Sequence, residues 1–268
     1  MYGALVNEGP VMKVRATVAY DGAPFHGFAA NAGVPTVAGL LVGVLERILR
    51  TEVSLTCAGR TDRGVHAVGQ VVGFDLSERS DEELEILRGI VNRRIGPSVV
   101  LSALERVDED FDARFSATSR TYRYRILDRL EPDPMLATRV WHVPHSLDLA
   151  AMEVASADLV GLHDFTSFCL QQDSWPDGSS PTMVRRVTAT SWRRVSDGPS
   201  GADLLEFEVS ASAFCQRMVR SMVGTLVAVG RGEMAVDAMP AVLAARKRQA
   251  AADSAPAQGL VLWSVSYS

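Results

Sequence analysis

The chain has 268 residues, of which 47% are hydrophobic, and its formal net charge is −5. This length allows one large domain or two smaller ones. The hydrophobic fraction is too high for a disordered chain. No apolar run reaches the ~18 residues that a membrane-spanning helix needs, and no signal peptide is apparent. The composition therefore predicts a globular protein with no membrane partner.

The cysteines are scattered along the chain and form no CxxC pair. They are Cys57, Cys169 and Cys215. This pattern argues against a disulfide framework and a zinc site, and it favours a cytoplasmic location. The spacing of His142 and His145 permits metal binding, but Pro144 between them favours a loop or the start of a strand. We therefore predict no metal site.

The charges are strongly segregated along the chain. A net negative charge alone argues against a nucleic-acid partner. Acidic residues gather in 75–85 and 105–112, whereas residues 114–129 hold five arginines against the single Asp128. A genome that favours arginine codons would explain the excess of arginine over lysine but not this clustering. Because the planar guanidinium group suits phosphate and stacked bases, the cluster favours a nucleic-acid partner.

The first predicted elements are a strand and a helix. Apolar side chains alternate with polar ones at Val14, Ala16, Val18 and Tyr20, which is typical of a half-buried strand. From Val37 to Leu49 the apolar residues recur at i, i+3, i+4 and i+7, and Thr36 precedes them. We therefore predict a helix that is capped by Thr36.

The next elements complete a recognisable order. Residues 53–57 and a segment through 71–74 are predicted as strands on either side of a charged turn. Ser80 and Glu83 form a capping-box signature before the second helix, Gly96–Pro97 ends it, and residues 98–107 return as a strand. The resulting order, βαββαβ, is that of the ferredoxin-like unit.

The second half is predicted to repeat this order without repeating the sequence. Stretches 128–147 and 171–182 are rich in Pro, Ser, Asp and Gly and are expected to be loops. The expected strands are 119–127, 184–195, 203–210 and 260–267, and the expected helices are 148–160, 214–229 and 235–248. The fold class is therefore α+β, with two ferredoxin-like halves, 1–112 and 113–268, whose antiparallel sheets join around a central active-site cleft.

The turn within CAGRTDRGVHAVGQ is more charged than a turn requires. In one interpretation it is an Asx-type turn, in which Gly59 and Gly64 supply unusual backbone angles and Asp62 bonds its own backbone. In the other, Asp62 is a nucleophile or general base that the flanking arginines keep ionised. A haloacid-type phosphatase needs a second acid where Gly64 stands. A retaining glycosidase needs a paired carboxylate, and none is obvious in the neighbouring strand.

GRTDRGVHAVGQVV resembles the signature of the bacterial tRNA pseudouridine synthase I family, also called the TruA family. Five further blocks resemble family blocks in the family order. They are YDGAPFHGF (20–28), DFDARFSATSRTYRYRI (110–126), GLHDFTSF (161–168), AFCQRMVRSMVGTL (213–226) and PAQGL (256–260). A lone GRTD would be a weak signal, whereas six ordered blocks are a specific one.

The resemblance implies an enzyme that isomerises uridine to pseudouridine at nucleotides 38–40 of the tRNA anticodon stem-loop. It implies a homodimer that needs no cofactor. By the same resemblance Asp62 is the catalytic aspartate, Arg60 helps to extrude the target base, and Tyr122 stacks on the uracil. Arg220 is placed against the aspartate, and Leu260 lines the pocket.

The residues alone leave several alternatives open. Asp62 would either attack the ribose C1′ or take a proton from C2′, and both routes need a dry pocket and a base out of its stack. Tyr122 is also an ordinary strand aromatic, and Arg60 suits a solvated turn. Arg220 lies at the edge of the apolar arc of its helix, where it either pairs with Asp62 or extends its head to water.

The chain departs from the family at four places. Alanines stand where the family commonly has glutamines, and another pair replaces a frequent histidine pair. They are Ala29, Ala30, Ala38 and Gln216–Arg217. These departures affect the expected tRNA contacts but leave the catalytic block intact. The rival classes are a non-catalytic RNA-binding protein and an aspartate-dependent hydrolase of a small molecule.

Overall fold

A computed structural model of the protein describes residues 10–170, 182–197 and 201–268. The chain forms two compact units: Met1–Thr118 with Leu262–Ser268, and Ser119–Val261. The predicted halves were 1–112 and 113–268, with the last strand in the second half. In the structure most of this strand belongs to the first unit, because β10 (Leu260–Tyr267) lies next to β3 (His66–Ser77) in the sheet order.

The sheet of the first unit contains β3, most of β10 and three further strands. The remaining strands are β1 (Val11–Tyr20), β2 (Thr56–Cys57) and β4 (Val99–Arg106). Their order is β4-β1-β3-β10, and β2 pairs with β3. The pairs β1–β3, β1–β4 and β2–β3 are all antiparallel. The alternation predicted for β1 is confirmed, since Met12 and the even-numbered residues through Tyr20 are buried.

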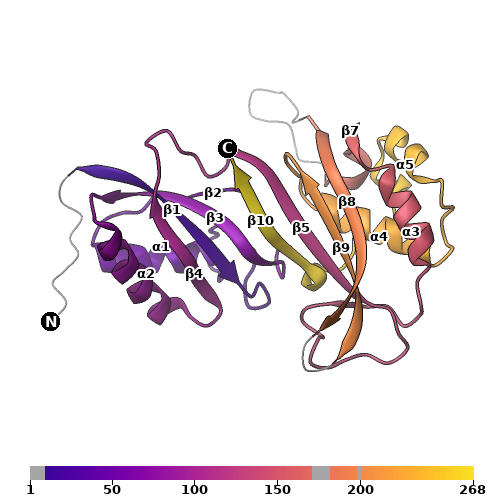
Figure 1. The fold of residues 1–268 in the computed structure, drawn as a ribbon, viewed down its shortest axis with the longest axis horizontal. Helices are drawn as coiled ribbons and strands as arrows, with labels where there is room; N and C mark the ends of the chain where they lie inside the picture. The colour runs from indigo at the N-terminus through magenta and orange to yellow at the C-terminus, as the bar shows by residue number, and fades with distance from the viewer. Residues whose placement is uncertain (1–9, 171–181, 198–200) are drawn as a thin grey trace. The chain divides into compact units, whose positions relative to one another are not determined.

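Two helices pack side by side in this unit, α1 (Val37–Leu49) and α2 (Asp81–Ile95) (Figure 1). Both predicted caps are confirmed. The Thr36 hydroxyl accepts a hydrogen bond from the Gly39 amide, and Ser80 and Glu83 form the complete capping box. Along the chain the order of elements is β1-α1-β2-β3-α2-β4, the predicted βαββαβ.

The second unit contains the strand order β5-β9-β8-β7, and β6 pairs with β5. The strands are β5 (Ala117–Leu127), β6 (Trp141–His142), β7 (Gly161–Asp164), β8 (Val184–Asp197) and β9 (Ala202–Ala211). Helices α3 (Leu149–Ala157), α4 (Met218–Gly230) and α5 (Met239–Ala245) lie together to one side of β8 and β9 (Figure 1). The predicted α+β class is confirmed, with sheet pairing that is mostly antiparallel. The ferredoxin-like description of both halves stays a prediction.

Some predicted boundaries differ from the structure. β6 and β7 were not predicted, because strands of two and four residues are too short to show an alternating pattern. α4 begins at Met218 rather than at residue 214, since Arg217 adopts a left-handed conformation with φ of 64°. Residues 171–181 of the second predicted loop lie outside the described residues. In the described part of the chain, no helix is long and apolar enough to cross a membrane.

The cysteine pattern argued against disulfides, but the structure contains one. A disulfide joins Cys169 and Cys215, whose Cα atoms are 5.8 Å apart. The two residues are 46 positions apart in sequence and belong to no recognisable motif, so only the folded second unit brings them together. Disulfides are more usual in oxidising compartments. The cysteine usage therefore gives no support to the predicted cytoplasmic location.

Three arginines surround one buried carboxylate on β9, on the sheet face opposite Tyr122. The Glu206 side chain is 1% exposed and pairs with Arg125 at 2.8 Å, with Arg123 at 3.7 Å and with Arg193. Burial raises the pKa of Glu206, but hydrogen bonds from Arg125 and Arg193 outweigh this effect and leave the pKa below its usual value. The carboxylate therefore stays charged in the folded protein at neutral pH.

We expect Glu206→Gln to lower the free energy of unfolding by about 2–3 kcal/mol at pH 7, somewhat less than for a fully buried pair because the arginines are partly exposed. Calorimetric unfolding measures this loss. Because the folded-state pKa of Glu206 is lowered, the difference between the proteins should shrink as the pH falls below 4.5. Glu105→Gln, which removes an exposed pair with Arg15, is the matched control and should cost under about 1 kcal/mol. Equal losses in the two variants would contradict this role for Glu206.

Candidate active site

The charged turn connects β2 to β3 in the first unit. Arg60 and Arg63 are exposed on it, Asp62 is half-buried, and the amide of Val65 donates to the carbonyl of Asp62 at 3.1 Å. Gly64 has the predicted left-handed conformation, with φ of 80°. Gly59 does not share this positive φ. The turn thus presents a partly accessible carboxylate between two exposed guanidinium groups.

The YDGAPFHGF block packs directly against this turn. The Phe28 amide donates to the Thr61 carbonyl at 3.1 Å, and the Gly22 amide donates to Nδ1 of His66 at 3.0 Å. A Cβ atom on Gly22 would lie 2.1 Å from the Val65 carbonyl oxygen, so no side chain fits there without moving the turn. Two sequence blocks that are far apart in the chain therefore form one rigid piece around Asp62.

A buried hydrogen-bond network that involves Tyr20 and Gln70 supports the charged turn. The Tyr20 hydroxyl bonds the Thr61 hydroxyl at 2.8 Å. Nε2 of Gln70 donates to the Gly59 carbonyl at 2.7 Å, and Oε1 of Gln70 accepts from the Val71 amide at 3.2 Å. Burial raises the pKa of the Tyr20 hydroxyl far above its usual range, so this group keeps its proton. The network therefore holds Gly59 and Thr61, the two residues that flank Arg60. Thr61 also directly precedes Asp62.

Sequence reasoning missed this network. Tyr20 and Gln70 both lie inside blocks that were singled out, but their side chains were assigned no role. A partial signal was present at Tyr20 alone, whose polar side chain lies on the apolar face of the predicted first strand. The structure shows that Thr61, Tyr20 and Gln70 are all buried. Polar groups of this kind are retained in a core when they are hydrogen-bonded.

Tyr122 lies on β5 of the second unit, where it pairs with Val209 of β9. Its side chain is buried, and its ring meets that of Phe214 edge to face at a centroid distance of 5.1 Å. Such a T-shaped contact is a favoured arrangement of two rings and stabilises their orientation. The neighbouring Arg123 points to the other face of the sheet and bonds Glu208, as the alternation along β5 predicts.

Arg220 occupies a singular position on α4. Every other residue of this helix is buried, while Arg220 is half-buried. Its Nε donates to the Ala255 carbonyl at 2.7 Å, and its own carbonyl accepts from the Ala255 amide at 2.9 Å. The predicted place at the edge of the apolar arc is confirmed. The guanidinium group is also anchored by protein rather than by water alone.

Residues 256–259, which precede Leu260, contact the side chain of Tyr124. The Tyr124 hydroxyl donates to the Pro256 carbonyl at 2.8 Å, and a Cβ atom on Gly259 would lie 2.6 Å from the Tyr124 ring. Burial raises the pKa of Tyr124, and the nearby positive charge of Arg220 opposes that rise. Leu260 is buried at the start of β10. Arg220 and the segment that ends at Leu260 thus belong to one cluster.

The predicted site residues therefore form two groups. Asp62 and Arg60 lie on one turn of the first unit, whereas Tyr122, Arg220 and Leu260 belong to the second unit. Each group is built by contacts within its own unit. The roles that the resemblance gives to these residues remain predictions.

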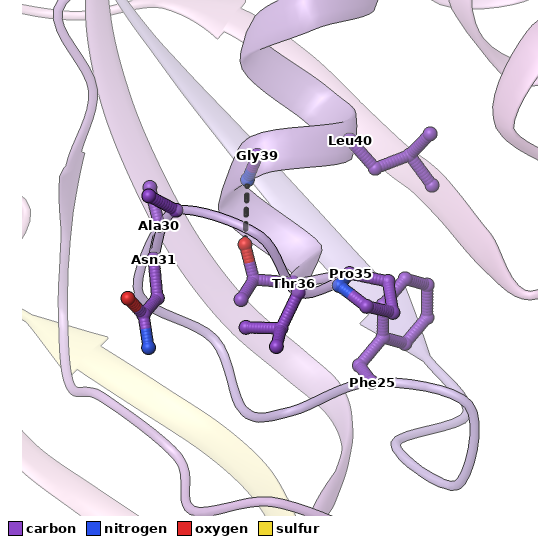
Figure 2. A pocket seen from close by; sticks show the side chains of 9 residues that line it. Phe25, Ala30, Asn31, Pro35, Thr36, Gly39 and Leu40 are labelled. Carbon is purple, nitrogen blue, oxygen red and sulfur yellow. Dashed lines mark hydrogen bonds between the residues drawn. The ribbon is translucent and has the colours of Figure 1, made fainter.

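The structure also contains a hollow at the start of α1. Its volume is about 570 Å³, and Figure 2 shows Asn31, Pro35 and Thr36 along it together with the Thr36–Gly39 hydrogen bond. Ala30, one of the positions where the family commonly has glutamine, also lines it. Neither Asp62 nor Arg60 does. The candidate site is therefore defined by the charged turn and not by this hollow.

Metal-ligating side chains do not cluster in residues 10–170, 182–197 and 201–268: no group of three or more His, Cys, Asp or Glu residues is placed to hold an ion. His142, which was considered as a ligand, instead has its Nε2 2.9 Å from the carbonyl oxygen of Arg129.

Comparison with known proteins gives a consistent result. Residues 155–268 match the family described as tRNA pseudouridine synthase. The chain is 41% identical to tRNA pseudouridine synthase A of Caulobacter vibrioides, over 95% of this chain and 98% of that protein. It is 37% identical to the protein of the same name from Bacillus pumilus, over 96% and 99% of the two chains. A dye-decolorizing protein from V. cholerae shows a TM-score of only 0.20 at 11% identity, which is too low to indicate a shared fold.

Proposed function

Because this chain belongs to the tRNA pseudouridine synthase A family, we propose that it isomerises uridine to pseudouridine at one or more of positions 38, 39 and 40 of the tRNA anticodon stem-loop. The proposal makes Asp62 the catalytic group and requires no cofactor. It is supported most strongly by the charged turn, where a half-buried carboxylate stands between two exposed arginines on a rigid support.

The proposed reaction needs few catalytic groups. The bond between N1 of uracil and C1′ of ribose breaks, the base rotates, and a bond between C5 and C1′ forms. The C5 proton leaves, and N1 gains one. Asp62 would act either by adding to C1′ or by removing a proton from C2′, and both routes remain open. Each route needs the base to be out of its stack and enclosed.

The remaining site residues take supporting roles in the proposal. Arg60 is exposed beside Asp62, where it would help to extrude the target base. Tyr122 would stack on the extruded uracil, a contact worth ~1–3 kcal/mol per base by alanine substitution. Arg220 would pair with Asp62, and Leu260 would line the pocket. The held ring of Tyr122 and the anchored guanidinium of Arg220 suit these roles, because neither group needs to be ordered on binding.

The family membership also leads us to propose a cytoplasmic homodimer of two ferredoxin-like halves per chain. Sedimentation with and without tRNA would measure the assembly.

The departures from the family at Ala29, Ala30 and Ala38 leave the charged turn unchanged. We therefore expect them to affect the choice among positions 38–40 rather than the reaction itself.

One assay separates this proposal from its rivals. Unmodified tRNA transcripts carrying uridine labelled with tritium at C5 release tritium when pseudouridine forms, and chemical mapping locates the modified nucleotides. The proposal predicts release and modification confined to positions 38–40. tRNA binding without release would indicate a non-catalytic RNA-binding protein. Absence of both would favour a small-molecule hydrolase.

The network beneath the turn gives a further prediction. We expect Thr61→Val to reduce kcat about tenfold with little change in the KM for tRNA, because the lost hydroxyl leaves the buried Tyr20 hydroxyl without its 2.8 Å partner and loosens the residue before Asp62. Thr61→Ser keeps the hydroxyl and should retain most of the activity. Steady-state tritium release measures both constants. If Val and Ser behave alike, the hydroxyl does not position the turn.

A further inference from the structure

A second turn lies close to the charged turn and is unusually well held. Oδ1 of Asp112 accepts hydrogen bonds from the amides of Arg114 and Phe115 at 2.7 and 2.8 Å. The Ser116 hydroxyl meets the Asp112 amide at 3.0 Å, and the Ser116 amide donates to the Asp112 carbonyl at 3.0 Å. The backbone of residues 112–116 is therefore fixed before any ligand binds.

This second turn and the charged turn share one small apolar core in the first unit. Ala113 is fully buried and packs with Ala58 and Val71, and its carbonyl accepts a hydrogen bond from the Tyr267 hydroxyl at 2.8 Å. Ala58 is separated from Arg60 only by Gly59. The contact of Ala113 with Ala58 thus links the position of residues 112–116 to the start of the charged turn.

The electrostatics agree with this proximity. Burial raises the pKa of the Cys57 thiol, and the positive charges of Arg60 and Arg114 both oppose that rise. Both guanidinium groups therefore lie within electrostatic range of the same side chain, at the start of the charged loop.

The outer surface of the second turn carries an aromatic ring. Phe115 is 79% exposed, and the guanidinium carbon of Arg114 lies 5.3 Å from the centre of its ring. A single exposed apolar side chain is ordinary on a protein surface. This one, however, is presented by a rigid turn beside the candidate catalytic loop, with a cation over its ring.

We propose that Phe115, together with Arg114, forms a stacking platform for an unpaired nucleobase of the RNA substrate, next to the uridine that reacts. The proposal rests on the proposed function. Aromatic rings and arginine planes are the surfaces on which proteins stack unpaired RNA bases. The exposed acidic residues Asp108, Glu109 and Asp110 precede the turn and disfavour a phosphate there, so the neutral base is the better partner.

Three substitutions at position 115 separate stacking from simple apolar contact. Phe115→Ala and Phe115→Leu both remove the aromatic face, and each should raise the Kd and the KM for unmodified tRNA about tenfold, with kcat within threefold of the original. Phe115→Trp should keep the affinity, and the fluorescence of the introduced indole should be quenched on binding. Met135→Ala is the matched control, because Met135 is 82% exposed on the second unit, and it should change nothing.

A fluorescent base analogue identifies the nucleotide. 2-Aminopurine placed singly at anticodon-loop positions beside the target should be quenched at one position by the original protein and not by Phe115→Ala. If Phe115→Ala and Phe115→Leu both bind tRNA within twofold of the original, the platform does not exist. A changed oligomeric state at unchanged tRNA affinity would show a protein interface instead.

The controls distinguish this proposal from the proposed function. Tritium release by the original protein is measured in the same series. Its absence would overturn the proposed activity, whereas its presence together with unchanged Phe115 variants would overturn the platform alone. Because Phe115 is mostly exposed, its variants should unfold at the temperature of the original protein, which calorimetry verifies.

Discussion

Replacement of Asp62 by asparagine is expected to abolish pseudouridine formation while tRNA binding survives. The amide keeps the size and shape of the carboxylate but is neither a nucleophile for C1′ nor a base for C2′. The backbone support of the turn uses the Asp62 carbonyl and the Thr61 carbonyl and hydroxyl, so it should persist in the variant. We expect turnover to fall at least about a hundredfold, the lower end of the effect of losing a general base.

Tritium release and fluorescence anisotropy with labelled tRNA measure the two quantities separately. The matched control is Asp75→Asn, which removes a surface carboxylate of the same unit that pairs with Lys13, and it should leave both unchanged. Turnover within about tenfold of the original protein would show that another group does the chemistry. A Kd that weakens in parallel with turnover would instead indicate that Asp62 mainly holds the substrate.

The parts of the fold that depend on local interactions could be predicted from the sequence. The caps at Thr36 and Ser80 and the alternation along β1 involve residues within a few positions of one another, and the structure shows all three. The disulfide between Cys169 and Cys215 and the short strand β7 depend on segments that meet only in the folded second unit. No local sequence pattern indicates which distant segments come into contact.

The candidate site divides in the same way. The charged turn was recognisable from its composition and from the family blocks around it, and the edge position of Arg220 followed from helical periodicity. The bonds from Tyr20 to Thr61 and from Gln70 to Gly59 could not be derived, because they need β3 to be paired with β1 and with β2 first. Gly22 was a usable signal, since the close approach of the Val65 carbonyl requires a residue with no side chain.

The second large effect is expected at Arg220. Its guanidinium group is held by the Nε bond to the Ala255 carbonyl, on a helix whose other residues are all buried. If the guanidinium group also pairs with Asp62, as we propose, Arg220→Leu removes the cation that orients the proposed catalytic carboxylate. We expect kcat to fall about a hundredfold, whereas the Kd for tRNA should change by less than about threefold.

Arg220→Lys tests whether charge alone is enough. A lysine keeps the charge but lacks the planar fork, and it cannot both bond the Ala255 carbonyl in the same geometry and reach a carboxylate, so it should recover only part of the turnover. Arg217→Leu is the matched control on the exposed residue that precedes α4, and it should raise the KM for tRNA and leave kcat nearly unchanged. If Arg220→Leu changes only the unfolding temperature, by loss of the Ala255 bond, then Arg220 is a structural anchor and not a positioning residue.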